Sequence, residues 1–376
     1  MMNKEQKKSY ISEMETQFQN NEAVLVTHYQ GLTMTQLDDL RAQMREHGIK
    51  FKITKNRITK LAIEKTKCKD LSNLFTGATA VAFSNDAIMS ARILSKFASL
   101  YAERFFNVGI AEQNLVGVAA GLSNEGFKVV ASAQACFLSM RCYEQVRQFS
   151  GYMGLPLVYV GVSSGFALTY FGNTHYALED VSLFRSIPGM TVISPSDSGQ
   201  AIKAIMAALD LHTPVYIRCT GVPGLPPIYK EEFEYEIGKG IVLKEGDDVV
   251  LITAGSVTRN ALEAADIMQF ELGISFKVID MHTISPVDKE LLNNCLGAKL
   301  WVSVEEHFVD GGLGSVVAEY LVDNFDSNKP NLLRIGIDNK FSIPGDYDYL
   351  LESNELDAGG IAKNIIGAIQ RVYKDE

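Results

Sequence analysis

Short apolar runs alternate with segments of helical periodicity through most of this 376-residue chain, and that alternation restricts its fold more than any other feature. In the middle of the chain the sequence predicts a strand in FFNVGI, a helix from about Ala111 to Gly121, a strand in KVVASA and another helix. Strands that alternate with helices indicate a mostly parallel sheet covered by helices. The same pattern returns after Glu236. We therefore predict an α/β protein: a small N-terminal α/β domain, then two three-layer α/β domains with mostly parallel sheets.

One segment must be distinguished from a membrane helix, because residues 149–178 contain no Asp, Glu, Lys or Arg. The segment is longer than the ~20 apolar residues that a membrane-spanning helix requires. Glycines, Pro156 and a pair of serines interrupt it and would leave backbone groups unsatisfied in lipid. We predict instead a strand that is buried on both faces within LPLVYVGV.

The five cysteines are odd in number and scattered, without any C-x-x-C pair. This pattern argues against both a disulfide framework and a thiolate zinc site. The first residues carry charges but no apolar run behind them, so we expect no secretory signal. The expected location is a reducing cytoplasm.

Charge is distributed unevenly along the chain. Residues 1–98 carry 15 Lys or Arg against 10 Asp or Glu, whereas the remaining 278 residues carry 20 against 35. The first part can therefore attract a polyanion, and the second part would repel one. Eight basic residues and a single acid lie between Lys50 and Lys69. This run is typical either of a solvated helix face or of a surface for RNA phosphates.

The first hundred residues resemble a ribosomal family. HYQGLTMTQLDDLRAQMREHGIKFKITKNRITKLAIE and LFTGATAVAFS are similar to the N-terminal domain of the bacterial stalk-base protein, large-subunit protein L ten, over about residues 3–98. The resemblance implies a domain at residues 1–98 that binds ribosomal RNA. It also implies that the RNA contacts come from Lys52, Lys55, Asn56, Arg57 and Lys60. The remainder of that family's domain and its C-terminal stalk-binding helix do not follow.

From about Arg104 onward the chain resembles the transketolase-like branch of thiamine-diphosphate enzymes, particularly its separately encoded C-terminal half. The motifs that carry this resemblance are RFFNVGIAEQNLVGVAAGL, MRCYEQVR, THYALED, FRSIPGMTVISPSD, VIDMHTISPVD and VEEHFVDGGLGS. The resemblance implies a pyrimidine-binding domain at residues 99–225 and a transketolase C-terminal domain, which supports dimerisation, at residues 236–376. PGLPPIYKEEFEYE, with three prolines, is predicted to connect them.

The resemblance assigns two residues to the thiamine diphosphate cofactor. Glu112 matches the glutamate that protonates a nitrogen of the aminopyrimidine ring, so that the cofactor's own amino group can deprotonate the thiazolium carbon. Phe137 matches the aromatic residue that stacks on the pyrimidine. On position alone, Glu112 would only partner its helix dipole and Phe137 would only pack in the core. A second aromatic residue that is frequent in the family is Gln134 here.

His175 lies in FGNTHYALED, at the position where the family has a catalytic histidine near the reactive carbon and the substrate. A single histidine is otherwise more often a hydrogen-bonded structural residue. Asn173 replaces a proline that is common in the family, which leaves the loop's shape open. His307 is a further candidate at the mouth of the site. No metal site is expected, because His175 and Glu179 supply two ligands without a third.

Two arginines are candidate anion partners. Arg141 is predicted to bind the cofactor or a phosphorylated substrate, and Arg218 is a second candidate for the same substrate. Surface or ion-pair roles are the alternative interpretation for both.

The resemblance also implies a partner chain. In the family, the diphosphate is held through a divalent metal by a domain that carries G-D-G, and this sequence contains no G-D-G. The implied partner is a diphosphate-binding transketolase N-terminal subunit that brings Mg²⁺, and the chain alone should have negligible activity. The leading interpretation is the C-terminal component of a transketolase that transfers a two-carbon ketol unit between sugars.

Three alternatives stay open at this point. The chain can be an RNA-binding stalk-base fragment with a passenger domain, or a non-functional gene fusion. G-x-S-x-G at residues 161–165 weakly suggests a serine hydrolase, but no helix signature follows it.

The join between the two resemblances leaves the pyrimidine-binding domain without a first strand of its own. We hypothesise that Thr79–Ser84 fills that position, since a parallel pair needs only an apolar strand and a right-handed crossover. Asn85 and Asp86 would then lie where the family often has an acidic residue.

Overall fold

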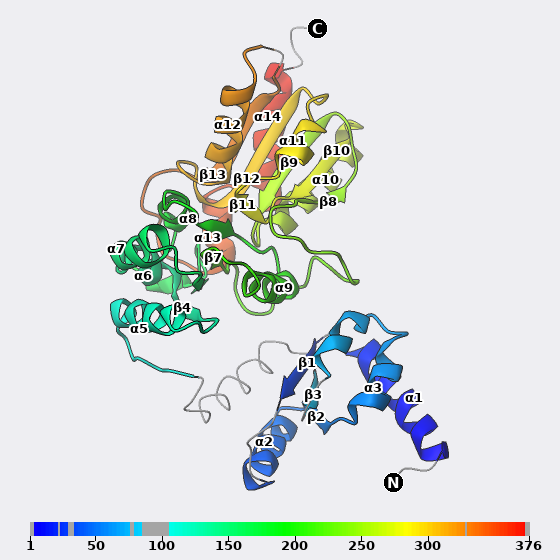
Figure 1. Ribbon diagram of the computed structural model, residues 1–376. Helices are drawn as coiled ribbons and strands as arrows, with labels where there is room; N and C mark the ends of the chain where they lie inside the picture. The colour runs from blue at the N-terminus through cyan, green and yellow to red at the C-terminus, as the bar shows by residue number, and fades with distance from the viewer. Residues whose placement is uncertain are drawn as a thin grey trace. The chain divides into compact units, whose positions relative to one another are not determined.

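The computed structural model describes residues 4–21, 23–28, 34–75, 79–84, 105–327 and 329–372 (Figure 1). The chain divides into two compact units, and each is described by itself. Unit 1 comprises residues 1–107 with 230–233, and unit 2 comprises residues 108–229 with 234–376. No helix in the described ranges is both long enough and apolar enough to cross a bilayer.

Unit 1 contains a three-stranded antiparallel sheet in the order β1 (Ala23–His28), β3 (Thr79–Ser84), β2 (Lys50–Ile53). Its helices are α1 (Lys4–Asn20), α2 (Met34–Glu46), α3 (Asn56–Ile63) and the short η1 (Lys69–Leu74). Side chains alternate along β3, so that Val81 and Phe83 pack with α1 and α3 whereas Ala82 packs with α2. The small α/β domain predicted from the sequence is therefore present.

The hypothesis that Thr79–Ser84 completes the sheet of the next domain is wrong. Strand β3 is the central strand of unit 1, and β1 and β2 pair with both of its edges. A strand whose two edges are occupied has no hydrogen-bonding groups left for another sheet. Asn85 and Asp86, which belong to this hypothesis, lie outside the described residues.

The first sheet of unit 2 has the order β11-β6-β7-β5-β4. Strands β4 (Val130–Gln134), β5 (Val158–Val162), β7 (Val215–Arg218) and β6 (Thr191–Ile193) are parallel, and β11 (Thr283–Ser285) is antiparallel to β6. Helices α5 (Glu112–Asn124), α6 (Ala135–Met140) and α8 (Asp180–Arg185) pack on one face, and α9 (Ser198–Ala208) packs on the other. Shorter helices are α7 (Tyr143–Val146), η2 (Arg147–Tyr152) and η3 (Thr169–Phe171).

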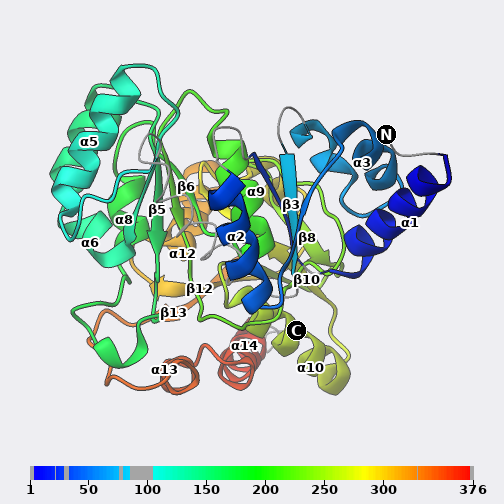
Figure 2. The same ribbon diagram turned by 90° about the horizontal axis from the view of Figure 1, so that it is seen from below.

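The second sheet of unit 2 has the order β13-β12-β9-β10-β8. Strands β9 (Val249–Ala254), β10 (Phe276–Asp280), β12 (Leu300–Phe308) and β13 (Asn331–Ile337) are parallel, and β8 (Ile241–Lys244) is antiparallel to β10. Helices α10 (Thr258–Leu272) and α14 (Ala358–Val372) lie side by side on one face (Figure 2). Helix α12 (Leu313–Asn324) covers the other face near α11 (Lys289–Asn293), and α13 (Tyr347–Ser353) precedes α14.

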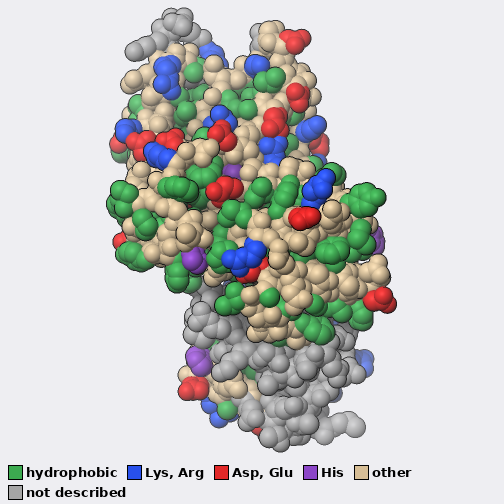
Figure 3. All heavy atoms as spheres, turned by 90° about the vertical axis from the view of Figure 1, so that its left-hand side faces the viewer, with side chains coloured by type: hydrophobic (Ala, Val, Ile, Leu, Met, Phe, Trp, Pro, Cys, Tyr) green, Lys and Arg blue, Asp and Glu red, His purple; other side chains and the backbone are tan. Residues whose placement is uncertain are grey.

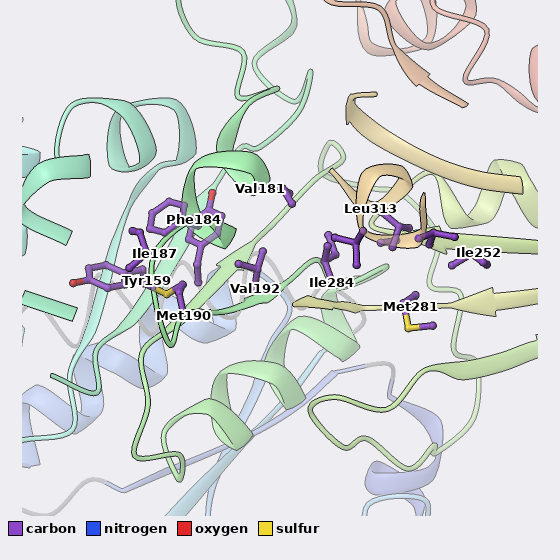
Figure 4. Packing of buried hydrophobic residues seen from close by; sticks show 14 of the residues in the cluster. Tyr159, Val181, Phe184, Ile187, Met190, Val192, Ile252, Met281, Ile284 and Leu313 are labelled. Carbon is purple, nitrogen blue, oxygen red and sulfur yellow. The ribbon is translucent and has the colours of Figure 1, made fainter. Parts of the chain in front are cut away.

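One hydrophobic cluster continues from the first sheet of unit 2 to the second. It runs from Tyr159 and Phe184 through Ile284 to Ile252 and Leu313 (Figure 4). Ile284 belongs to β11, which follows the connecting segment but joins the sheet before it. The two sheets therefore share a core, and the first sheet takes its edge strand from the part of the chain that forms the second.

The strand predicted in FFNVGI does not form. Residues 105–109 have no regular secondary structure, and Phe105, Phe106 and Ile110 are exposed. An apolar run becomes a strand only where a neighbouring strand pairs with it, and β4 is the last strand of this sheet.

A candidate cofactor site at the start of helix α5

Glu112 is the first residue of α5, and it is buried. The chain turns into the helix at Gly109, whose φ of +76° lies in the left-handed region that favours glycine. A carboxylate at a helix N-terminus interacts favourably with the helix dipole. The turn at Gly109 therefore places the Glu112 carboxylate at the helix N-terminus, where the helix dipole offsets part of the cost of its burial.

Arg141 makes two contacts with the predicted site residues. Its Nη1 donates to Glu112 Oε2 at 2.6 Å, and its guanidinium lies 4.3 Å from the centroid of the Phe137 ring. Phe137 belongs to α6, which begins directly after β4, and Arg141 is the residue that ends this helix. Gln113 Nε2 donates to the Arg141 carbonyl at 3.2 Å and holds the Arg141 backbone against α5.

His175 completes the group. Its ring packs edge-on against Phe137, with the ring centroids 5.3 Å apart, and lies 5.2 Å from the ring of Phe171. Its Nδ1 shares a hydrogen bond of 2.9 Å with Thr174 Oγ1. The structure therefore brings together the three residues that the resemblance selected and Arg141, the candidate anion partner, from three separate segments of the chain.

Asn173 fixes the loop that carries His175. Its Nδ2 donates to the Ser342 carbonyl at 2.8 Å, and its Oδ1 accepts from Ser342 N at 3.1 Å. The residue that replaces the family's proline thus ties the loop to the segment before α13.

Arg218 has a structural ion pair rather than a free anion site. It is 1% exposed, and its Nε donates to Asp180 Oδ2 at 2.9 Å. Its Nη2 donates to the carbonyls of Ala177 and Glu306. The ion-pair interpretation holds for Arg218, which joins the His175 loop to α8 and β12.

The VEEH motif is buried at the end of β12. Glu306 accepts from Phe166 N, Ser256 Oγ and Tyr347 OH, and Glu305 accepts from two backbone amides at the start of α12. Burial raises the pKa of Glu305 to about 7. Burial also lowers the pKa of His307 to about 4. His307 is fully buried, so it does not reach the mouth of a site.

Glu179 has a raised pKa because of burial, and its Oε2 accepts from the backbone amide of Leu178. Among the described residues, no cluster of three His, Cys, Asp or Glu side chains is suited to a metal ion.

Exposed hydrophobic side chains are numerous in the segments that carry the site. Figure 3 shows such side chains gathered on one face of unit 2. The exposed hydrophobic residues of these segments are Ile110, Met140, Tyr152, Met153, Tyr170 and Phe171, and Ile110 is 94% exposed. A group of exposed hydrophobic side chains on one face of a protein is typical of an interaction site.

The RNA-contact candidates of unit 1 are not equally free. Lys52 Nζ donates to Glu13 Oε1 at 2.7 Å and lies 5.0 Å from the centroid of the Tyr10 ring, so this lysine is occupied by α1. Lys55 and Arg57 are exposed, and Lys60 and Asn56 are half-buried. Asn56 Oδ1 accepts from Thr54 Oγ1 at 3.1 Å.

Three family models match the chain. They are "Ribosomal protein L10" over residues 2–99, "Transketolase, pyrimidine binding domain" over residues 66–220 and "Transketolase, C-terminal domain" over residues 238–361. The first two models overlap at residues 66–99.

Individual proteins match in the same two parts. The large ribosomal subunit protein uL10 of Pelagibacter ubique is 91% identical over 97 residues, which are 26% of this chain and 58% of that protein. A putative transketolase C-terminal section of Methanocaldococcus jannaschii is 38% identical over 277 residues, which are 73% of this chain and 86% of that protein. A subunit of the apulose-4-phosphate transketolase of Phocaeicola vulgatus is 35% identical over 77% of this chain and 92% of that protein.

A solved structure agrees with the sequence matches. It is a split-gene transketolase described as an inactive β4 tetramer, and it is similar to this chain with a TM-score of 0.65 and 37% identity. The similarity covers 73% of this chain and 86% of that one.

Proposed function

This chain belongs to the transketolase family as a transferase component, and we propose that it supplies the pyrimidine-binding half of a thiamine diphosphate site that a second polypeptide completes. The observation that carries the proposal is that Arg141 contacts both Glu112 and Phe137, while the ring of His175 packs against Phe137. The proposed domain boundaries are residues 1–98, 99–225 and 236–376, with β11 crossing from the last domain into the sheet before it.

The residues present fit the pyrimidine ring of the cofactor. A flat group with an N–H donor already lies over Phe137 and hydrogen-bonds to Glu112, namely the guanidinium of Arg141. An aminopyrimidine is likewise flat and requires a carboxyl group at a ring nitrogen and an aromatic face. When bound, thiamine diphosphate supplies the nucleophilic carbon that accepts the two-carbon unit.

Each residue of this chain then has a separate task. Glu112 holds a proton at the ring nitrogen, and its burial keeps water from competing for that proton. Phe137 orients the ring plane by stacking. His175, whose ring touches Phe137, lies beside the ring site and is suited to hydrogen-bond a substrate oxygen.

We propose that the partner is a transketolase N-terminal subunit that binds the diphosphate through Mg²⁺. Two observations support this: the sequence has no G-D-G, and the segments around the site expose hydrophobic side chains. The similar split-gene transketolase, which is described as an inactive β4 tetramer, also supports it. The proposed assembly contains a dimer of such pairs, and this chain without its partner has negligible activity.

The proposed reaction is transfer of a two-carbon ketol unit between sugars. The relative from an apulose-4-phosphate transketolase supports a phosphorylated sugar as one substrate. The proposed compartment is the cytoplasm, which the five free cysteines support.

The experiment that tests the proposal is co-expression with a transketolase N-terminal subunit, followed by activity and calorimetric titration of thiamine diphosphate with Mg²⁺. Glu112→Gln should lower kcat by at least about a hundredfold, because a positioned proton donor contributes that much or more. The matched control is Glu125→Gln, which changes an exposed glutamate at the other end of α5 and should leave kcat unchanged. Equal activity of the Glu112→Gln and Glu125→Gln complexes would remove Glu112 from the mechanism.

A second candidate function is binding of ribosomal RNA by unit 1. The 91% identity to a uL10 protein over 97 residues favours it, and Lys55 and Arg57 are exposed. A filter-binding assay of the full chain with the uL10-binding fragment of ribosomal RNA tests this function. Loss of binding in a Lys55→Gln, Arg57→Gln variant would support a specific phosphate contact.

A further inference from the structure

We propose that Arg141 occupies the pyrimidine position of the free chain and leaves it when the cofactor binds. Arg141 is then a positioning residue that keeps Glu112 paired until the ring arrives. This inference rests on the proposed function, because it concerns the same carboxylate and the same aromatic ring.

The argument begins with the contacts of the guanidinium. Arg141 donates to Glu112 Oε2 at 2.6 Å and stacks on Phe137 at 4.3 Å. The pyrimidine ring requires the same carboxylate and the same ring face. Two flat groups cannot lie on one face of Phe137 together, so the cofactor and the Arg141 side chain exclude each other.

The structure leaves the Arg141 side chain free to move while its backbone stays. Its backbone amide donates to the Phe137 carbonyl at 3.0 Å, and its carbonyl accepts from Gln113. The side chain is 45% exposed, whereas that of Glu112 is 10% exposed. Among the described residues, Glu112 is the hydrogen-bond partner of the guanidinium, so one contact and one stacking interaction must break.

The replacement of Arg141 by the pyrimidine ring keeps Glu112 paired in both states. A nearly buried carboxylate without a partner is costly, because burial removes its hydration. Arg141 provides a partner in the absence of cofactor, and the ring nitrogen provides one in its presence. The carboxylate is therefore never left unpaired, and cofactor binding must overcome the arginine contact.

The test measures binding rather than activity. The probe is the hydroxymethyl aminopyrimidine that forms the ring half of thiamine, titrated into the full chain by calorimetry or saturation-transfer NMR. Arg141→Met should bind this probe about threefold to tenfold more tightly than the parent, because a partly exposed ion pair and a cation–π contact no longer compete. Arg141→Lys keeps the ion pair but not the flat group, and its affinity should lie between the two.

The control is Arg147→Met, which removes an exposed arginine close by in the chain and should leave the affinity at the parent value. Thermal melts of all variants establish that they fold. If Arg141→Met bound the probe as weakly as the parent or more weakly, the displacement of Arg141 would be refuted while the pyrimidine site would stand. If neither parent nor variants bound the probe, the proposed function itself would fail.

A crystal structure with the probe bound gives a second readout. The expected result is the probe over Phe137, with Arg141 Nη1 no longer in contact with Glu112. A probe seated elsewhere, with the Arg141–Glu112 contact intact, would overturn the inference.

Discussion

At the scale of single residues, a buried ion pair holds the loop that carries His175. Arg218 and Asp180 form an ion pair that is almost completely inaccessible, and Arg218 also holds the carbonyl of Ala177, two residues after His175. Removing one partner of a buried pair leaves an uncompensated charge and costs about 3–5 kcal/mol. The position of the loop that carries His175 is thus linked to the stability of unit 2.

His307 makes one contribution to the stability of unit 2 that is lost in acid. The buried His282, whose pKa burial lowers to about 4, acts in the same direction, and Glu305, whose pKa burial raises to about 7, acts in the opposite direction. The pKa of His307 is about 4 in the folded chain because burial disfavours the charged ring, whereas the value of an exposed histidine is about 6.5. The unfolded chain therefore binds the proton first as the pH falls, and stability is lost between about pH 6.5 and pH 4. The loss from this residue is at most about 3 kcal/mol.

The measurement is the free energy of unfolding of unit 2 in denaturant at pH 7 and at pH 5. Relative to the parent, His307→Asn should shift the difference in unfolding free energy between pH 7 and pH 5 towards higher stability at pH 5, whereas His212→Asn, at an exposed histidine, should leave this difference as in the parent. An identical pH dependence in the parent and the His307→Asn variant would show that His307 makes no such contribution.

The family resemblance implied that Glu112, Phe137 and His175 serve one site, whereas residue type and position alone favoured structural roles for each of them. The contact of Arg141 with Glu112 was not predicted, because the spacing of 29 residues gives no sign that the turn after α6 reaches the start of α5. The role of Arg218 was open for the same reason: its partners Asp180 and Glu306 are brought to it by folding alone.

At the scale of elements, two glycines of unit 2 differ in the space around them: Gly165 is closely surrounded and Gly117 is not. Gly165 has a φ of +64°, and a Cβ there would lie 2.1 Å from Glu306 Oε1, a buried carboxylate. Gly117 lies inside α5, and a Cβ there would meet no atom within 4 Å.

Gly165→Ala should therefore lower the free energy of unfolding by at least about 2 kcal/mol through strain and overlap. Gly117→Ala should raise it by about 0.5–1 kcal/mol, because alanine favours a helix over glycine. Chemical denaturation of both variants beside the parent checks the pair. A Gly165→Ala variant as stable as the parent would mean that the loop does not approach Glu306 so closely.

Helical and strand periodicity predicted most elements of unit 2, but it gave no information on pairing. The apolar run at residues 105–110 remains irregular, and within the described ranges no strand pairs with it. The short segment Thr283–Ser285 becomes the edge of a sheet formed by residues far before it, which no local pattern indicates. The predicted pairing of Thr79–Ser84 with the next sheet is wrong for the same reason, since any apolar strand can form a parallel pair and the sequence does not show which sheet it joins.

At the scale of the whole molecule, we expect unit 2 to fold without the first 98 residues. Deletion of residues 1–98 should leave the melting temperature of unit 2 unchanged within about 2 °C, because β3 contributes its hydrogen bonds to β1 and β2 alone. Differential scanning calorimetry of the full chain and of residues 99–376 makes the comparison. A decrease of several degrees would show that unit 2 draws support from the ribosomal-like segment.

Strand β11 also limits where a gene for this protein can be divided. A break upstream of the first sheet of unit 2 separates none of the described strands from its sheet. A break at the proline-rich connector would instead leave β6 in the upstream fragment without its partner strand β11. The downstream fragment would contain β11 without its sheet and would expose part of the shared hydrophobic cluster. We therefore expect a break at the first position to disturb the fold of unit 2 less than a break at the second.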